Sequence, residues 1–579
     1  MADEDKLKRE TYELLGGINQ KVSTYLNGQN EFRTLVNMNF VNPGALTKRP
    51  GTSLYLGATV SGRITGGTEF ERLNGASYVV ATANTNAYTV TSSFNAFRTG
   101  LANGALFDFV TLVDRLFCAN GQDFFKFDGT NHSNYSLPLP PAGVTAYGIA
   151  GGTLVAGTYQ VSYGYLNDRG YYGPGSTAIS VTVGGGATGA IKFDGLTTLT
   201  GYGITALSFY RTTPGGVAQF GTTSIPMGAT TYTDLGAALG TRAAPESLFF
   251  TLAPRYLEIY NNQMFMAGFS SIPSTIYWSD IGEPESVDPT YFAEFRTNDG
   301  DRVMGMKAYQ GSLMVFKERS FHRLTGDNPD NFQLSEISDQ YGCVSNRALV
   351  VYENYLLFLD PKGIGEYDGA SIKISSTKLE PIFNAMNLAA ARDNAVAVHY
   401  RRFNEVWFAI PINGSTINNC IVVFDYVANA WTTYEGIDAS VLFVAKGSQP
   451  EKTVFYGGYT GSLSYFGASL FGDNGQGITC LFNTMYHVEG PRTGTRLWRR
   501  FYLDVDPISG VTQSIPCTFN TDYGSSVALA ATMYQAPFQS RLDFGLPAKS
   551  IQAQVGHYSA TLPFKVNGYA FESRYLRSV

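Results

Sequence analysis

Polar turns divide this chain into short apolar and aromatic runs, and one arrangement of runs and turns returns along its length. The arrangement is an aromatic or leucine lead-in, a polar turn, an apolar run, a second turn and a short aromatic run, as in residues 112–129. Further copies begin at Tyr260, Tyr309 and Tyr352, and looser ones lie from Tyr400 and around Val454. Short apolar runs between Asn, Asp and Gly turns predict β-hairpins.

The spacing of this repeat is that of a propeller blade. From Asn262 the equivalent turn returns after 49, 43 and 50 residues, at Gly311, Asn354 and Asn404. A single four-stranded blade leaves both faces uncovered, so such copies have to stack into a closed ring. Residues 355–359 and 406–410 are continuously apolar, and we expect them to be innermost strands. The copies predict a β-propeller of about six blades.

The period breaks between the copy at Leu112 and the copy at Tyr260. A stiff proline-rich stretch, residues 137–141, opens the extra segment. Within it, residues 157–165, 178–183 and 207–211 alternate between apolar and polar positions, with glycine-rich turns between them. This pattern predicts an inserted β-sandwich of the immunoglobulin or fibronectin type III kind over residues 142–247.

The rest of the chain divides around these two units. We expect an N-terminal arm over residues 1–30, in which residues 3–15 form either a short helix or a solvated segment. The first part of the propeller then covers residues 31–141, with its first blade starting within residues 32–52, and the remainder covers 248–475. Residues 476–579 lack the repeat but contain strand patterns, which predicts a C-terminal β-domain.

Composition agrees with an all-β protein and gives little indication of its chemistry. The 579 residues include 37 Tyr, 39 Phe and 63 Gly but only 15% charged residues, which is typical of many short strands joined by tight turns. The formal net charge of −6 provides no basic surface for tight nucleic-acid binding. Any DNA that this protein meets is therefore expected to pass it rather than to be held.

The cysteines and the N-terminal residues suggest in which cellular compartment the protein is made. Five widely spaced cysteines suggest neither a disulfide framework nor a thiolate metal site, so we interpret them as buried apolar residues made in a reducing cytoplasm. The first ten residues are charged, and no apolar run is long enough to span a bilayer. The sequence predicts no secretory signal and no membrane span.

No catalytic, cofactor-binding or metal-binding residue is assigned from the sequence, and we expect no enzymatic activity. Residues 184–189 match the Gly-x-Gly-x-x-Gly pattern, but a strand pattern follows instead of a helix, so we interpret them as a hairpin loop. The acids of Asp128-Gly129, Asp299-Gly300 and Asp368-Gly369 fit hairpin turns. The five histidines lack metal-ligand spacing.

A cluster of basic residues and a pair of acids stand out in the last hundred residues. Trp498 is surrounded by Arg492, Arg496, Arg499 and Arg500, which predicts a solvated or salt-bridged strand face, with a contact between subunits as the alternative. Asp504 and Asp506 alternate along a strand, where a cation is one possible partner and solvent the other.

Several sequence segments, here called phrases, resemble the nozzle, or lower tail-tube, proteins of short-tailed bacteriophages. This group includes related head-completion and stabilisation proteins. The first is residues 40–52, with the turn Arg-Pro-Gly-Thr at 49–52. The second is residues 262–268 followed by 273–285, which contain Tyr277-Trp278-Ser279-Asp280. The third is residues 312–319 leading to 342–345 and 363–369. The C-terminal hundred residues carry no such phrase.

This resemblance implies a structural virion protein located in the tail and made in the host cytoplasm. Its copies would associate as a homo-oligomeric ring, six to the ring, around a channel for genomic double-stranded DNA. Its partners would be the portal and adaptor proteins and the tail fibres or needle, with contact to the host surface as a further possibility. The family supplies no catalytic residues, and it does not separate a nozzle from a collar or plug protein. The alternative is a carbohydrate-binding propeller adhesin or receptor-binding tail protein.

Overall fold

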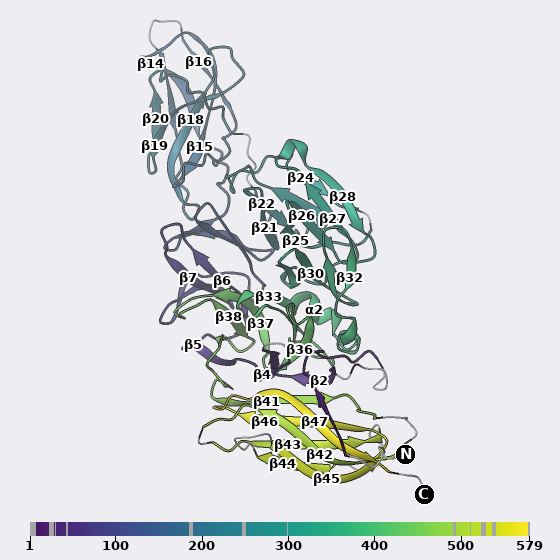
Figure 1. The fold of residues 1–579 in the computed structure, drawn as a ribbon. Helices are drawn as coiled ribbons and strands as arrows, with labels where there is room; N and C mark the ends of the chain where they lie inside the picture. The colour runs from purple at the N-terminus through teal and green to yellow at the C-terminus, as the bar shows by residue number, and fades with distance from the viewer. Residues whose placement is uncertain are drawn as a thin grey trace.

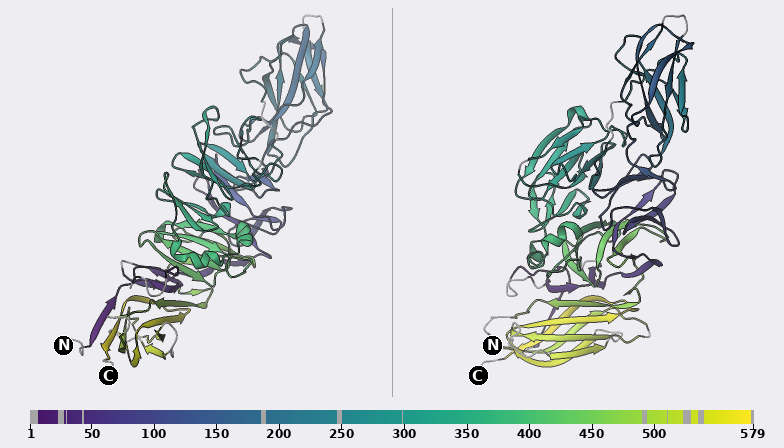
Figure 2. Two further views of the ribbon diagram at one scale, coloured as in Figure 1. Left: turned by 90° about the vertical axis from the view of Figure 1, so that its right-hand side faces the viewer. Right: turned by 180° about the vertical axis from the view of Figure 1, so that it is seen from behind.

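The computed structural model contains three β units in a row (Figures 1 and 2). An inserted sandwich forms one end, a propeller the middle and a C-terminal sandwich, which also holds the N-terminus, the other end. The structure describes residues 7–22, 28, 30–41, 44–184, 189–245, 250–297, 299–489, 494–509, 511–522, 529–534 and 540–576. The predicted all-β class is confirmed.

The propeller contains seven four-stranded antiparallel blades within the described residues. Blade 1 is β6 (Ile64–Glu71), β7 (Ser77–Ala83), β8 (Asn86–Val90) and β9 (Phe94–Arg98). Blade 2 is β10 (Asp108–Leu112), β11 (Arg115–Ala119), β12 (Phe124–Phe127) and β13 (His132–Asn134). Blade 3 is β21 (Tyr256–Tyr260), β22 (Gln263–Ala267), β23 (Thr275–Trp278) and β24 (Phe292–Glu294).

Four blades complete the circle. Blade 4 is β25 (Val303–Tyr309), β26 (Ser312–Lys317), β27 (Phe321–Thr325) and β28 (Gln333–Ser338). Blade 5 is β29 (Leu349–Tyr352), β30 (Tyr355–Asp360), β31 (Gly363–Tyr367) and β32 (Ile372–Ile374). Blade 6 is β33 (Val396–Tyr400), β34 (Glu405–Ile410), β35 (Cys420–Asp425) and β36 (Ala430–Glu435). Blade 7 is β37 (Ala439–Ala445), β38 (Thr453–Gly458), β39 (Ser462–Gly467) and β5 (Gly51–Thr59).

The ring closes because a strand from the N-terminal part of the chain completes the last blade. β5 pairs antiparallel with β39, and β37 contacts β6 of blade 1. The sequence predicted about six blades and the structure has seven, since β5 lies far from the rest of its blade in sequence and blade 1 carries no copy of the repeated phrase. Short helices α1 (Glu380–Asn384) and α2 (Leu388–Asn394) connect blades 5 and 6.

The prediction of which strands are innermost is wrong. Residues 355–359 and 406–410 belong to β30 and β34, the second strands of their blades, whereas the first strands of successive blades contact one another around the centre. A second strand is covered on both faces by the neighbouring blades, which requires apolar residues throughout. The first strand faces the polar bore, so it carries charges such as Glu258 and Lys307.

The inserted unit is a two-layered sandwich. One layer is β14 (Thr145–Leu154), β17 (Gly189–Asp194) and β20 (Thr231–Asp234). The other is β16 (Ile179–Val183), β15 (Gly157–Asn167), β18 (Ile204–Arg211) and β19 (Phe220–Pro226), and Tyr163 and Phe209 pack between the layers. The glycine-rich segment at 184–189 connects β16 to β17 in the opposite layer, so it is not a hairpin loop; its residues 185–188 lie outside the described part.

The C-terminal sandwich combines both ends of the chain. One layer contains β1 (Lys8–Tyr12), β3 (Met38–Phe40), β4 (Leu46–Lys48), β42 (Arg496–Val505), β45 (Ser540–Ala548) and β47 (Lys565–Tyr575). The other contains β41 (Gln476–Thr484), β43 (Ser514–Thr521), β44 (Leu529–Tyr534) and β46 (Ile551–Ser559). β2 (Phe32–Val36) and β40 (Gly472–Asp473) join this second layer to blades 6 and 7.

Two expectations for the N-terminal residues are therefore corrected. In place of the helix considered for residues 3–15, the described residues contain the strand β1, which pairs with β47 and buries Tyr12 against Tyr569. Of residues 32–52, only Gly51 and Thr52 belong to the propeller, as the start of β5 in blade 7, since β2, β3 and β4 extend the layers of the C-terminal sandwich. The backbone N–H and C=O groups of β2 and β4 form hydrogen bonds with β41 and β47, and the local sequence does not reveal these distant partners.

Candidate functional site: the propeller mouth and the two joints

The central bore of the propeller is narrow and polar. A cavity of about 220 Å³ is lined by all seven first strands, from Gly66 of β6 to Leu442 of β37. Inside it, Nζ of Lys307 lies 2.9 Å from Oε2 of Glu258, and Asn346 donates a 2.9 Å hydrogen bond to Asp108. Burial raises the pKa of Asp108 to about 6. A nucleic-acid duplex, whose major groove alone is about 12 Å wide, does not fit into a cavity of this volume.

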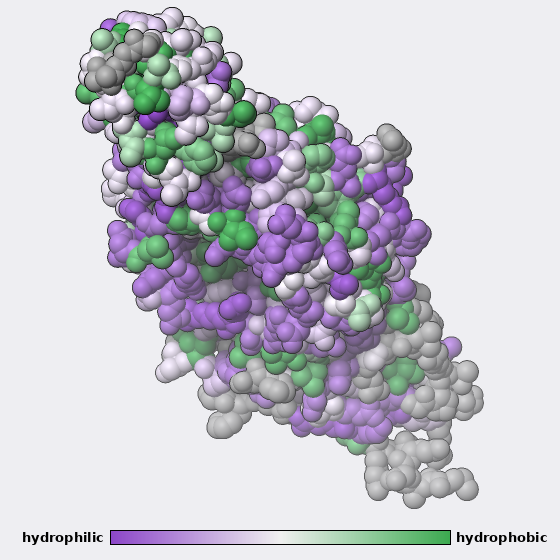
Figure 3. Space-filling model, turned by 90° about the horizontal axis from the view of Figure 1, so that it is seen from above, coloured by the Kyte–Doolittle hydropathy of each residue, from purple (hydrophilic) through white to green (hydrophobic). Residues whose placement is uncertain are grey.

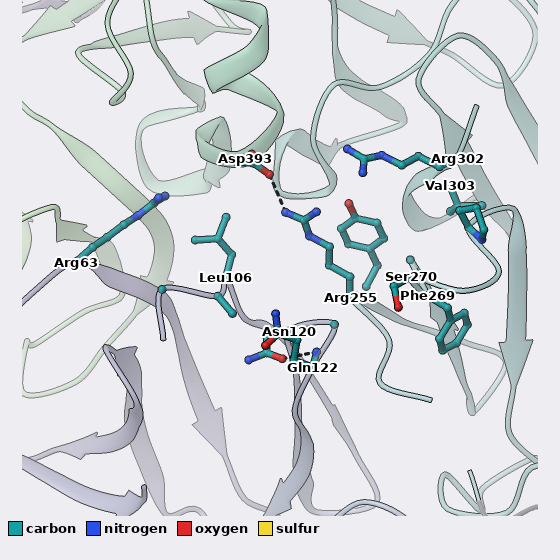
Figure 4. Close-up of a pocket in the computed structure, with 16 residues that line it drawn as sticks. Arg63, Leu106, Asn120, Gln122, Arg255, Phe269, Ser270, Arg302, Val303 and Asp393 are labelled. Carbon is teal, nitrogen blue, oxygen red and sulfur yellow. Dashed lines mark hydrogen bonds and ion pairs between the residues drawn. The ribbon is translucent and has the colours of Figure 1, made fainter. Parts of the chain in front are cut away.

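A larger pocket of about 520 Å³ opens at one mouth of this bore (Figure 4). Arg63, Arg255 and Arg302 project into it from the starts of the first strands of blades 1, 3 and 4. Asp393, at the end of α2, lies 2.8 Å from Nη2 of Arg255. Gln122 and Ser270 add exposed polar groups from loops of blades 2 and 3.

Sequence reasoning missed this basic group. The signal that identifies it is positional: Arg63, Arg255 and Arg302 each stand immediately before the first residue of an inner strand, and Arg347 stands two residues before β29. Residues at this position of successive blades converge on one mouth of the ring. Widely spaced arginines in a chain of net negative charge therefore become neighbours only when the ring closes.

The first joint attaches the inserted sandwich to the propeller. Lys126 of β12 and Glu285, in the loop after β23, form an ion pair, and Asn167 at the end of β15 donates 3.2 Å hydrogen bonds to both Glu285 oxygens. Burial raises the pKa of Glu285, and Lys126 opposes this shift. Lys126, Glu285 and Asn167 come from blade 2, blade 3 and the sandwich, so their contacts fix these units to one another.

Neighbouring residues of the same loop extend this joint. Tyr135 donates a hydrogen bond of 2.5 Å to the carbonyl of Pro284, and Tyr171 of the sandwich donates one of 3.5 Å to the carbonyl of Gly282. Gly282, Pro284 and Glu285 close the second phrase that resembles the nozzle proteins. In this structure, the phrase forms the seat of the inserted sandwich.

The second joint attaches the C-terminal sandwich to the propeller. Arg49, in the Arg-Pro-Gly-Thr turn, is fully buried and donates to both carboxylate oxygens of Asp473 at 3.0 and 2.5 Å. Its Nε donates to Asn37 at 2.8 Å, and its guanidinium lies 5.6 Å from the ring centre of Tyr434 in blade 6. The turn in the first phrase is therefore the point at which β4, β5 and β40 meet.

The third phrase connects adjacent blades. The buried Lys317 of blade 4 donates to the carbonyls of Phe295 and Arg296, both at 3.1 Å, and lies 2.7 Å from Asp299. The backbone N–H of Cys343, which leads into blade 5, donates to the carbonyl of Lys317 at 2.9 Å. Lys317 thus links blades 3, 4 and 5.

The acids and arginines singled out from the sequence are mostly paired within the molecule. Asp128 and Asp368 form the expected hairpin turns, each accepting two backbone N–H bonds. Asp299 lies in the loop between blades 3 and 4, where it accepts one from Asp301 and binds Lys317. Arg496 pairs with Glu489 and Arg500 with Asp543 and Glu572, which agrees with a salt-bridged strand face. Arg492 lies outside the described residues. Asp506 binds Lys565 at 2.8 Å, and Asp504 is exposed.

The arrangement of the described residues bears on metal ions and membranes. Across them, no three His, Cys, Asp or Glu side chains gather as a potential metal site. None of the helices in the part of the chain that the structure describes has the length and apolar character to cross a membrane. All five cysteines are buried and unpaired, as interpreted from the sequence.

Comparisons with known proteins match the chain to distant structures. No family model matches it, and no curated protein matches it. Similar solved structures include YCF48 bound to a D1 peptide, at 11% identity over 75% of this chain and 97% of that one, with a TM-score of 0.28. The WD40 domain of Neurospora crassa Pan2 has 8% identity over 73% and 96%, with a TM-score of 0.26. Likenesses of this size carry no argument about function.

Proposed function

We propose that this chain is the nozzle protein of a short-tailed bacteriophage, a structural subunit of the virion tail. Copies associate side by side, six to a ring, around the channel through which genomic DNA leaves the particle. The observation that supports this proposal best is the location of the residues that resemble nozzle proteins. Arg49, Glu285 and Lys317 lie at the joints that turn a propeller and two sandwiches into one body.

The bore of the propeller is not the DNA channel in this proposal. Its cavity of about 220 Å³ is small and is lined by the Lys307 and Glu258 pair, so DNA passes between subunits of the ring in this proposal. A net charge of −6 suits a conduit, because a basic lining retains phosphates through counterion release whereas a neutral or acidic lining lets DNA slide. The propeller then acts as a rigid wall segment.

The two ends of the molecule provide surfaces for partners. Seen from the sandwich end, the tip of the inserted unit is neutral to apolar while the propeller surface is mostly hydrophilic (Figure 3). Three apolar side chains there, Val155, Val217 and Leu235, are 61%, 92% and 58% exposed. In the proposed tail, one end contacts the portal and adaptor complex, and the other contacts tail fibres, a needle or the host surface.

Native mass spectrometry with negative-stain imaging tests the proposal on the full chain, alone and mixed with its portal and adaptor complex. The expected result is a six-fold ring with a central hole wide enough for duplex DNA, or docking of such a ring onto the adaptor. A monomer or trimer that ignores the adaptor contradicts the proposal.

The second candidate is a carbohydrate-binding propeller adhesin or receptor-binding tail protein. The pocket of about 520 Å³ at the propeller mouth favours it, because it is concave, polar and assembled from several blades. This candidate predicts saccharide binding by a monomer or trimer, so the same mass measurement separates the two.

A further inference from the structure

The pocket at the propeller mouth concentrates positive charge in a chain that is acidic overall. Arg63, Arg255 and Arg302 line it, and Arg347 lies beside Arg255 in the adjoining cavity. Asp393 is the single carboxylate among the described residues that line the larger pocket. One carboxylate for three guanidiniums contrasts with the whole chain, which has more acidic than basic residues.

The guanidinium of Arg63 is the least satisfied of these groups. Its Nε and Nη2 are buried and have no hydrogen-bond acceptor among the described residues, and its face lies 4.8 Å from the ring centre of Tyr459. Burial lowers the pKa of Arg63, and burial together with repulsion from Arg63 lowers the pKa of Arg347 to about 10. Arginine side chains are charged near neutral pH, so the lining of the pocket carries more positive than negative charge.

The propeller fixes the backbone positions of the pocket arginines, and the Arg255 guanidinium is also held by Asp393. Arg63, Arg255 and Arg302 each directly precede the first residue of a different inner strand, and the backbone of each strand is fixed by its blade. Arg347 donates to the carbonyls of Ser440 at 3.3 Å and Asp393 at 2.6 Å, which fixes its fork. Guanidiniums that line one pocket are suited to binding carboxylate and phosphate groups, with which they form charge-assisted, often bidentate hydrogen bonds.

We propose that this pocket binds an oxyanion, a carboxylate or phosphate group carried on a small polar ligand. The anionic group lies among Arg63, Arg255 and Arg302, where it replaces or supplements Asp393 as the counter-charge. Gln122 and Ser270 at the rim provide hydrogen bonds to the uncharged part of the ligand. The volume of about 520 Å³ admits a ligand of small-molecule size. The proposal does not depend on whether the chain forms a tail ring.

Isothermal titration calorimetry on the full chain at low salt tests it with three probes: inorganic phosphate, glucuronate as the carboxylate source, and glucose as the uncharged match for glucuronate. Binding of phosphate or glucuronate that weakens as salt is added is the expected result, and the stronger of the two identifies the source of the oxyanion. Glucose is expected not to bind.

Variants locate the site. R63Q and R255Q are each expected to weaken anion binding at least tenfold, while R402Q, which removes an exposed arginine paired with Glu451 elsewhere, leaves it unchanged. If R63Q does not fold, R302Q removes an exposed lining charge without disturbing buried groups. Absence of anion binding to the wild-type chain, equal binding of glucose, or unchanged affinity in both R255Q and R302Q overturns the proposal.

Discussion

The ammonium of Lys126 pairs with the carboxylate of Glu285 where blade 2, blade 3 and the inserted sandwich meet, and their side chains are only 3% and 2% exposed. Asn167 completes the pair from the sandwich side. Such a pair gains little over apolar residues of equal volume, but removal of one partner leaves a buried charge uncompensated. The main effect of the Lys126 and Glu285 pair is therefore to hold the inserted sandwich in one orientation on the ring.

Replacement of Lys126 by Met is expected to destabilise this joint by about 3–5 kcal/mol, because Glu285 is left without its cation. The measurement is the melting temperature together with proteolysis near residues 137–141. The double variant Lys126→Met with Glu285→Leu is expected to recover part of the loss. Lys192→Met, which removes a partly exposed lysine paired with Asp194 in the inserted sandwich, is the control. Equal effects of Lys126→Met and Lys192→Met would contradict the assignment.

Arg49→Met is expected to weaken the joint between the propeller and the C-terminal sandwich by about 3–5 kcal/mol, since Asp473 and Asn37 lose their shared donor. Arg49→Lys keeps the charge but not the fork, so we expect an intermediate loss. Thermal unfolding measures both, with Arg296→Met, which removes an exposed pair with Glu336, as control. A lysine variant as stable as wild type would show that the bidentate geometry is unimportant.

Two glycines with nearly the same φ angle test the closure of the ring. Gly461 has φ of +84° and Gly475 has φ of +85°. A Cβ on Gly461 would lie 1.7 Å from the carbonyl oxygen of Val60, next to β5, whereas a Cβ on Gly475 meets nothing within 4 Å. Gly475→Ala is expected to cost about 1–2 kcal/mol for its backbone conformation alone, and Gly461→Ala distinctly more because it forces β5 away from β39. Hydrogen exchange of β5 amides checks this; similar protection in both variants would argue against β5 as the closing strand.

Stability is expected to depend on pH through Glu405, which is buried in blade 6 and accepts hydrogen bonds from Asn39 at 2.9 Å and Trp407 at 2.7 Å. Burial raises its pKa from 4.5 to about 8. Between those values the folded chain retains a proton that the unfolded chain releases. The contribution is therefore fully present below pH about 4.5 and declines as pH rises towards about 8, by about 1.4 kcal/mol per pH unit.

Glu405→Gln removes this titration, so its stability is expected to fall less than that of wild type between pH 5 and 8. Urea midpoints at pH 5, 6, 7 and 8 measure the slope. Glu451→Gln, at an exposed position, is expected to follow wild type. If Glu405→Gln and wild type have parallel pH profiles, Glu405 is ionised in the folded chain and this prediction is wrong.

The sequence by itself determined the class of fold and the presence of an insertion. Alternation in residues 157–165 and the repeated turns after Asn262 are local patterns, and local patterns decide whether a segment forms a strand. The apolar runs at 355–359 and 406–410 likewise predicted strands covered on both faces. Their position within the blade was predicted wrongly. The second strand of a blade is also covered on both faces, by the two neighbouring blades, so an apolar run does not distinguish it from the innermost strand.

The tertiary structure alone decided which distant segments meet. β5 closes blade 7, β1 joins β47, and Arg63, Arg255 and Arg302 converge on one mouth, although each pair of partners is far apart in sequence. Strands pair through backbone hydrogen bonds, which any compatible strand can form, and a buried cation can pair with any suitably placed carboxylate. The local sequence around a residue therefore does not indicate its partner. Closure of the ring supplies the missing constraint, and with it the joints and the basic pocket.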